Sequence, residues 1–264
     1  MKNIIVLICH YNNLEGLEKS LLSIQEDFPV DVLVVDDGSI QKPNLEHLKA
    51  IYKNGTIFLN LLPENVGVGI ATNIGLKKII ELGYTLTGRL DCGDINHPNR
   101  YKKQLEYLAQ KSEIKLLGTW VNMVDMHGNI VFVLKHPTTY KQIKSKMYIN
   151  NAFMNSASIF YIEILKEVGY FPEKYHRNGE DYAFFFKVIQ KYRAENLPEV
   201  LLDYEINPNS ISSQRRKEQI IARISIIKDH FYFGFYPVFG ILRNLTLLFV
   251  PQPIIIYLKK KFKK

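Results

Sequence analysis

The chain has 264 residues, of which 47% are hydrophobic and 12% aromatic, so it supports a large α/β domain and excludes wholesale disorder. Its two cysteines, Cys9 and Cys92, form neither a metal-binding pattern nor a disulfide framework, which indicates a reduced, cytosolic compartment. The formal charge of +8 comes from the end of the chain: residues 1–215 carry 24 basic and 24 acidic side chains, and residues 216–264 carry 10 and 2. This distribution argues against nucleic-acid binding and favours a basic tail at an anionic membrane surface.

Residues 1–91 alternate buried strands with helices. Apolar runs predict strands at 4–9, 31–36 and 57–61 and a fourth ending near Asp91, with helices at 14–24, 44–52 and 70–82. The first run is too short for a signal peptide. The alternation predicts an α/β fold with a mainly parallel central sheet flanked by helices. Because such sheets bind ligands at the carboxyl ends of their strands, we expect Tyr11, Asp37 and Asp91 to lie along one edge.

The second half of the chain loses this regular alternation. Its patterns predict helices at 100–111, 141–148, 161–168 and 180–191, strands at 115–124, 130–134, 157–160 and 199–204, and a further helix from Lys217. We therefore divide the chain into a domain at 1–215 and a helical extension at 216–264 that associates with a membrane.

The extension is aromatic and apolar from Phe231 and ends in Lys259–Lys264. We expect Arg243, Asn244 and two prolines, Pro251 and Pro253, to break what would otherwise be a spanning helix. A segment lying on the membrane or shallowly inserted, anchored by the lysines, is favoured. The alternatives are a helix packed on the domain with a solvated tail, and a true span.

Four short motifs carry most of the chemistry: Asp36-Asp37-Gly38-Ser39, Asn65-Val66-Gly67, Arg89-Leu90-Asp91-Cys92-Gly93-Asp94, and Gly179-Glu180-Asp181. Carboxylates three residues apart, at Asp91 and Asp94, suit a divalent cation shared with a phosphorylated ligand. Each motif alone has an ordinary structural explanation, namely a solvated turn, a capping aspartate or a first-turn helix acid.

Together, in this order and spacing, the motifs resemble the inverting glycosyltransferases of family 2, which have the GT-A fold. The resemblance covers about residues 1–215 and is strongest to bacterial enzymes that build O-antigen, capsule or lipooligosaccharide. It implies transfer of a sugar from a UDP- or dTDP-sugar to a glycan or lipid-linked acceptor. From the two cysteines and the basic, apolar C-terminal segment, we expect a cytoplasmic protein bound peripherally to the inner face of the cytoplasmic membrane.

The resemblance also implies roles for individual residues. Tyr11 would pack on the base, Asp37 would accept a hydrogen bond from its imide N–H, and Asp36 would act from the same turn toward the ribose. Asn73 would line the nucleotide from the other side. The sugar-transfer side is a separate set: Asp91 near the ribose and metal, Asp94 near the metal or acceptor, and Asp181 as general base beside Glu180.

Gly93 departs from the family pattern, which has a metal-binding carboxylate at this position. Either Asp91 and Asp94 share the Mn²⁺ or Mg²⁺, or the cation is held weakly with much water, or the need for metal is reduced. Thr72 stands where the family has an arginine, and Asn207 where it often has a histidine. Arg215 and Arg216 either reach the diphosphate instead or are solvated at the start of a helix.

Other classes fit less well. Gly67-Val68-Gly69 follows the third strand and lacks the third glycine of a dinucleotide-binding loop, which argues against a dehydrogenase. His10–Asn13 does not supply the glycine-rich basic loop expected of a sugar-nucleotide pyrophosphorylase. A non-catalytic, membrane-associated protein that binds glycans or nucleotides through a degenerate site remains the alternative, and Gly93 is the residue that supports it.

Overall fold

The computed structural model describes residues 4–175, 178–206 and 215–250. The strands are β1 (Ile4–His10), β2 (Asp31–Asp36), β3 (Ile57–Leu61), β4 (Leu86–Arg89), β5 (Ile95–Asn96), β6 (Ile114–Val124), β7 (Ile130–Leu134), β8 (Ile159–Tyr161) and β9 (Arg193–Glu205). The α-helices are α1 (Leu14–Leu22), α2 (Leu45–Ile51), α3 (Val68–Glu81), α4 (Arg100–Gln110), α5 (Tyr140–Met147), α6 (Leu165–Val168), α7 (Glu180–Lys191), α9 (Arg216–Asp229) and α10 (Phe235–Leu247). Short 3₁₀ turns occur at η1 (Asn155–Ala157), η2 (Ile162–Ile164) and η3 (Glu173–Tyr175).

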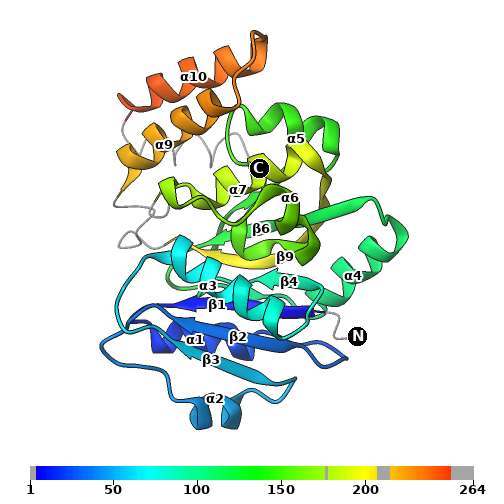
Figure 1. The fold of residues 1–264 in the computed structure, drawn as a ribbon, viewed down its shortest axis with the longest axis vertical. Helices are drawn as coiled ribbons and strands as arrows, with labels where there is room; N and C mark the ends of the chain where they lie inside the picture. Colours follow the sequence, from blue (N-terminus) through cyan, green and yellow to red (C-terminus); the bar gives the residue numbers. More distant parts are fainter. Residues whose placement is uncertain (1–3, 176–177, 207–214, 251–264) are drawn as a thin grey trace.

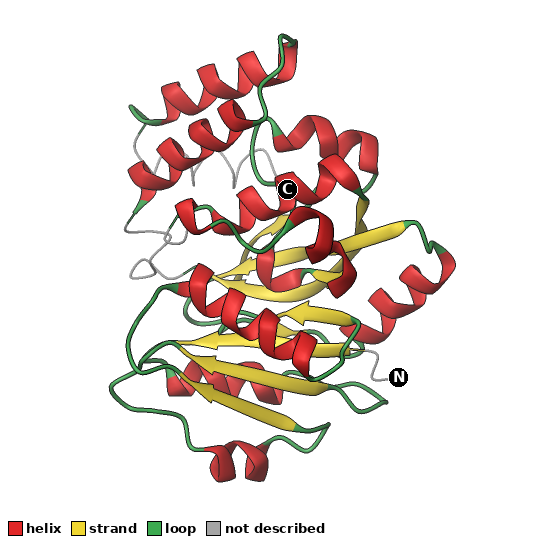
Figure 2. Ribbon diagram, in the orientation of Figure 1, coloured by secondary structure: helices red, strands yellow, loops and turns green. Residues whose placement is uncertain are grey.

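One sheet runs through the molecule in the order β3-β2-β1-β4-β8-β6-β9-β5, with β7 added beside β6 (Figure 2). β1 is parallel to both β2 and β4, and β2 is parallel to β3. β8 is antiparallel to β4 and β6, whereas β9 is parallel to β6. The predicted α/β fold is confirmed, but the parallel arrangement is continuous only across β1–β4 and the whole sheet is mixed.

Helices cover both faces of the sheet, and alternation along β1 assigns the faces. Ile5 and Leu7 pack in a cluster with buried residues of α3, α5, α6, α7 and α9. Ile4, Val6 and Ile8 pack in a second cluster with α1, α2 and α4. A strand that is apolar at every position has both faces buried, so the apolar run at 4–9 is explained by its central place in the sheet.

The chain changes direction across the sheet at β1. It passes from β1 outward to β2 and β3, and then returns to place β4 on the other side of β1. Figure 1 shows β1 running from the N-terminal marker toward the left, where the carboxyl ends of the parallel strands gather. The crevice at such a switch point is the usual ligand site of an open α/β sheet.

Strand β9 is longer than the predicted strand at 199–204. It starts at Arg193 and pairs with β6 through Leu197 opposite Thr119, before the register shifts so that Val200 lies opposite Trp120. Pro198 lies in this irregular stretch, and proline lacks the N–H that a regular ladder requires. The proline and the polar residues around it hid the first half of the strand from a pattern-based prediction.

The C-terminal helices pack on the rest of the molecule. Ala222, Ile226 and Ile227 of α9 belong to the same buried cluster as α7, so the composition boundary at 215 does not separate two cores. Within the described residues no helix is long and apolar enough to cross a membrane. The prolines and lysines expected to end and anchor the extension, at 251–264, lie outside the described residues.

The sequence predicts that Arg243 and Asn244 break the last helix. This prediction is wrong, because both residues lie inside α10. Their side chains donate hydrogen bonds of 3.3 Å to the carbonyl oxygen of Ile149, just after α5. Asn244 is fully buried, and Gly240 on the same side of α10 approaches the Tyr148 carbonyl closely. The polar residues therefore attach the helix to the domain.

Candidate functional site

The turn after β2 is locked to the end of β1 through Asp36. Its carboxylate accepts a hydrogen bond of 2.7 Å from Nδ1 of His10 and one of 3.2 Å from the Ser39 N–H. The Asn13 N–H donates to Nε2 of His10 at 3.1 Å, which places the imidazole proton on Nδ1. Asp36 has no exposed surface, so this geometry favours a supporting role for Asp36 over the expected contact with the ribose.

Asp37, the next residue, bonds to the loop at residues 65–67. Its carboxylate accepts hydrogen bonds from the backbone N–H groups of Val66 and Gly67, at 2.8 and 3.0 Å, and from the Asn65 side chain at 3.0 Å. Burial nevertheless raises the pKa of Asp37 above its usual value. Tyr11 stands beside this turn with 47% of its surface exposed, as a side chain that receives a flat ligand should. Contact of Tyr11 and Asp37 with a base stays a prediction.

Asn73 is used within the protein. Its side-chain amide donates to the carbonyl oxygen of Phe171 and accepts from the Phe171 N–H, both at 2.9 Å. This reciprocal pair ties α3 to the segment before η3 and leaves Asn73 buried. The arrangement favours an indirect role for Asn73, which positions α3 rather than touching a nucleotide.

Asp91 follows β4 on the other side of the switch point, and 37% of its side chain is exposed. Its two carboxylate oxygens lie 3.1 and 3.3 Å from Nδ2 of Asn155, and its backbone N–H donates to the Ser156 hydroxyl at 2.8 Å. Nη2 of the fully buried Arg89 lies 3.6 Å from Asp91 Oδ1. We did not single out Asn155 or Ser156 from the sequence, because nothing local marks a partner 64 residues away.

Asp94 points into the protein. It is only 5% exposed, bonds to the Ser156 hydroxyl, and lies 3.4 Å from the backbone N–H of Glu205. Burial and the nearby charge of Asp91 raise the pKa of Asp94 well above its usual value. Direct metal coordination by Asp94 stays a prediction, and the geometry fits a supporting role at the turn.

Gly93 has a φ of +105°, a backbone conformation that residues with a Cβ rarely adopt. Across the described residues, no group of three or more Asp, Glu, His or Cys side chains gathers to hold a metal ion. The protein therefore offers an exposed carboxylate at Asp91 rather than a closed cage. That donor set fits Mg²⁺ or Mn²⁺ arriving with a diphosphate, since Mg²⁺ is commonly bound by one or two carboxylates together with substrate phosphates and water.

Glu180 and Asp181 form the first turn of α7. The helix begins after Gly179, whose φ of +81° is in the left-handed region, and α9 packs beside it at Ala222 and Ile226. Asn151 donates a 2.9 Å hydrogen bond to Oδ2 of Asp181. Burial raises the pKa of both carboxyl groups, and the negative charge of Asp181 raises that of Glu180 further. Both therefore hold protons more readily than ordinary surface carboxylates.

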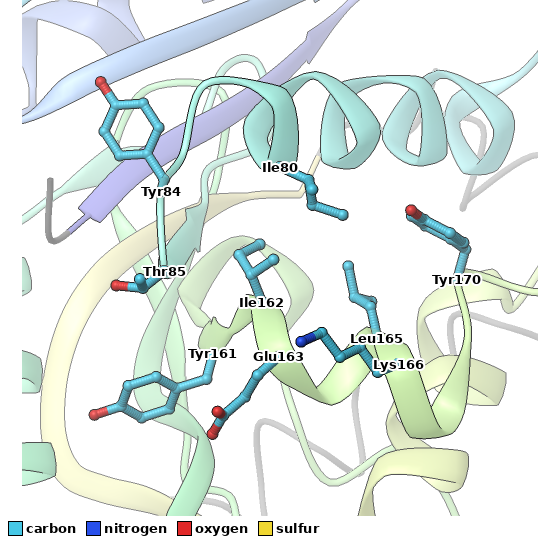
Figure 3. Close-up of a pocket in the computed structure, with 9 residues that line it drawn as sticks. All are labelled: Ile80, Tyr84, Thr85, Tyr161, Ile162, Glu163, Leu165, Lys166 and Tyr170. Carbon is cyan, nitrogen blue, oxygen red and sulfur yellow. The ribbon is translucent and has the colours of Figure 1, made fainter. Parts of the chain in front are cut away.

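A cavity of about 210 Å³ lies at Asp181, and its other polar walls are Asn150, Asn151, His136, Gln219 and Arg223. A separate, larger pocket of about 440 Å³ lies before β4 (Figure 3). That pocket is mostly apolar and includes none of the predicted site residues. The smaller cavity is therefore the candidate site, because it places a carboxylate with a raised pKa beside a space with polar walls.

Sequence comparisons match this chain to a described family and to named relatives. The model of the family described as glycosyl transferase family 2 matches residues 5–169. The amylovoran biosynthesis glycosyltransferase AmsE of Erwinia amylovora is 26% identical over 98% of both chains. A UDP-Gal:α-D-GlcNAc-diphosphoundecaprenol β-1,3-galactosyltransferase of Escherichia coli is 26% identical over 82% of this chain and 77% of its own length.

Solved structures share the fold. The mannosyltransferase PcManGT of Pyrobaculum calidifontis, in complex with GDP-Man and Mn²⁺, superposes with a TM-score of 0.66 at 18% identity, over 96% of this chain and 71% of that one. TarS 1–349 of S. aureus in complex with UDP gives a TM-score of 0.64 at 19% identity, over 96% and 73%. The match to another TarS 1–349 structure covers 65% of that chain. These likenesses support the fold.

Proposed function

The chain belongs to glycosyl transferase family 2 and is a glycosyltransferase, and from this premise we propose that it transfers a sugar, with inversion, from a UDP- or dTDP-sugar. The acceptor is a hydroxyl of a glycan or lipid-linked saccharide in the synthesis of a bacterial surface polysaccharide. The observation that carries the proposal is the placement of Asp181, with its raised pKa, at a cavity with polar walls. Relatives named for amylovoran synthesis and for a UDP-Gal donor support the substrate class.

The nucleotide lies, in this proposal, at the carboxyl ends of β1 and β2. Tyr11 packs on the base, and Asp37 receives its imide N–H with acceptor capacity left over from the three hydrogen bonds that it accepts within the protein. Asp36 fixes the turn after β2 through its hydrogen bond with His10, and Asn73 fixes α3 through its hydrogen bond with Phe171. The buried pair thus positions the residues that meet the ligand.

Asp91, oriented by Asn155, would hold a divalent cation against the donor diphosphate. When bound, the cation supplies a Lewis acid that stabilises the negative charge on the departing diphosphate. With a glycine at position 93, the protein contributes few ligands. We therefore propose that the donor phosphates and water complete the coordination.

The chemical step is a single displacement. The acceptor hydroxyl oxygen attacks the anomeric carbon, the bond from that carbon to the phosphate oxygen breaks, and the nucleoside diphosphate leaves with the bonding electrons. The hydroxyl proton passes to the Asp181 carboxylate, which acts as the general base. Asn151 fixes the orientation of this carboxylate through its 2.9 Å hydrogen bond. Glu180 lies beside Asp181 in the same turn, and burial raises its pKa to about 8.

We propose that α10 lies against the cytoplasmic face of the cytoplasmic membrane. Phe235, Val238, Phe239, Leu242 and Leu245 follow helical spacing and are all exposed. The opposite side of α10, at Pro237, Gly240 and Asn244, is buried against the protein. We call the five exposed side chains the apolar face of α10. Such a face, on a helix near a basic chain end, is typical of interfacial binding.

The test is sugar-nucleotide turnover by Asp181→Asn. Loss of the base should lower turnover by about 10²–10⁴-fold, while UDP affinity stays within a few-fold of the wild-type value. Hydrolysis of UDP-sugars and dTDP-sugars is measured with Mn²⁺, alongside UDP binding by thermal shift. Glu167→Gln, which neutralises an exposed carboxylate on α6, serves as the matched control.

Near-normal turnover by Asp181→Asn would remove Asp181 as the base. A wild-type protein that binds UDP but never turns over any sugar nucleotide would instead favour the non-catalytic alternative.

A further inference from the structure

The cavity at Asp181 has one cationic wall, the Arg223 side chain of α9. Arg223 forms no hydrogen bond or ion pair with another residue that the structure describes. A guanidinium group carries five N–H donors in a fork that matches phosphate and carboxylate oxygens. Arg223, whose donors none of the described residues uses, therefore lines the same cavity as the proposed general base.

Two further arginines lie close enough to act on Arg223. Burial lowers the pKa of Arg223, and the positive charges of Arg243 and Arg216 lower it further. Arg216 donates to the carbonyl oxygens of Leu247 and Val250, and Arg243 donates to that of Ile149. These acceptors are neutral, so they do not compensate the three positive charges. Tyr182 and the Asp181 carboxylate act in the opposite direction and raise the pKa of Arg223, but Asp181 is a single negative charge beside three arginines.

A bound anion would relieve this repulsion, since charges in a partly desolvated site interact more strongly than charges in water. The cavity, at about 210 Å³, is smaller than the roughly 300–1,000 Å³ of pockets for drug-sized ligands. The cavity is open to the surface, so it can hold the reacting end of an acceptor, but it is too small for a whole oligosaccharide. Helix α9 also packs directly on α10, the helix that carries the apolar face (Figure 1).

We propose that Arg223 binds the diphosphate of an acceptor whose sugar is linked through that diphosphate to a lipid. The sugar hydroxyl then lies toward Asp181, the phosphates lie against Arg223, and the lipid leads away toward the apolar face of α10. Anionic and apolar recognition on two adjacent helices matches an amphipathic acceptor, whereas a neutral glycan would need neither. This inference rests on the proposed function and specifies its acceptor.

The experiment titrates full-length, UDP-saturated protein with decyl diphosphate, octyl β-glucuronide and neutral octyl β-glucoside, all below their micelle concentrations. Binding is measured calorimetrically for the wild type and for Arg223→Gln, Arg223→Lys and Lys228→Gln. The last variant removes one positive charge from an exposed position on the same helix. UDP affinity is measured separately for each protein.

We expect the wild type to bind decyl diphosphate more tightly than either glycoside. Arg223→Gln should weaken that binding about tenfold or more, Arg223→Lys should weaken it less, and Lys228→Gln should leave it unchanged. Absence of decyl diphosphate binding in UDP-saturated wild type would overturn the inference and leave the proposed function standing.

Preference for the glucuronide would likewise reject a diphosphate in favour of a sugar carboxylate. Weaker UDP binding by the Arg223→Gln variant would show that Arg223 contacts the donor nucleotide, and this would overturn its assignment to the acceptor. A wild type that does not bind UDP at all would count against the proposed function itself.

Discussion

Single residues in the site fall into two groups, those whose polar atoms are occupied within the protein and those left available to a ligand. Asp36 and Asn73 are buried and bonded to His10 and Phe171. Tyr11 and Asp91 are exposed, and Arg223 lines a cavity with unused donors. Substitutions in the first group should act through positioning, and substitutions in the second should act on ligands directly.

The pH dependence of turnover tests the electrostatics at Asp181. Its folded pKa is raised by burial, and a general base works only when ionised, so activity should fall as the pH drops through that raised pKa. The acid limb of the pH–rate profile should therefore lie above the ordinary aspartate value of about 4. Because Glu180 and Asp181 are adjacent and interact, the apparent pKa read from this limb belongs to the two carboxyl groups together. A limb at the ordinary carboxylate value would contradict the assignment.

The sequence predicted the identity of the site carboxylates better than their surroundings. Asp91 and Asp181 were found because each belongs to a short local motif. Asn155, Asn151 and Arg223 were not, since they meet those carboxylates only through tertiary folding and no local pattern marks them. Asp36 and Asp37 look equivalent in the sequence and are both buried, but their partners differ: Asp36 accepts from His10 and Ser39, whereas Asp37 accepts from the loop at 65–67.

At the scale of elements, buried apolar runs were reliable guides. β2 and β3 have the predicted bounds and β1 differs by one residue, because a strand buried on both faces has a strong local signal. The bounds of β9 and α10 could not be predicted in this way, because they depend on tertiary contacts. The first half of β9 contains polar residues and a proline, and Arg243 and Asn244 in α10 find a buried carbonyl acceptor that the sequence does not reveal.

The attachment of α10 depends on Gly240. A Cβ there would lie 1.7 Å from the Tyr148 carbonyl oxygen, so Gly240→Ala should push the helix away from the domain. We expect a loss of about 1–3 kcal/mol in stability and a lower melting temperature by thermal unfolding. Limited proteolysis should show earlier cleavage near α10. Leu242→Ala, on the exposed side of the same helix, is the control, and equal melting temperatures for the two variants would argue against this close packing.

At the scale of the whole molecule, the apolar face of α10 predicts membrane binding. Replacing Phe235 and Phe239 by serine should reduce binding to vesicles that contain anionic phospholipid, because it removes large apolar side chains from the surface that would enter the lipid. Sedimentation with vesicles measures the bound fraction. Replacing Met126 and Ile130, exposed near the β6–β7 turn, by serine is the matched control. Equal effects of the two double variants would contradict a specific role for α10.

If α10 lies on a membrane, the two ends of the molecule would face different supplies of substrate. α10 lies at one end of the long axis and α2 at the other, with the carboxyl ends of β1–β3 between them (Figure 1). With α10 on a membrane, the nucleotide sugar would still arrive from bulk water in three dimensions, whereas a lipid-linked acceptor would arrive by lateral diffusion. The acceptor's effective concentration would then be its mole fraction in the bilayer, so adding inert lipid at constant total acceptor would slow the enzyme by surface dilution.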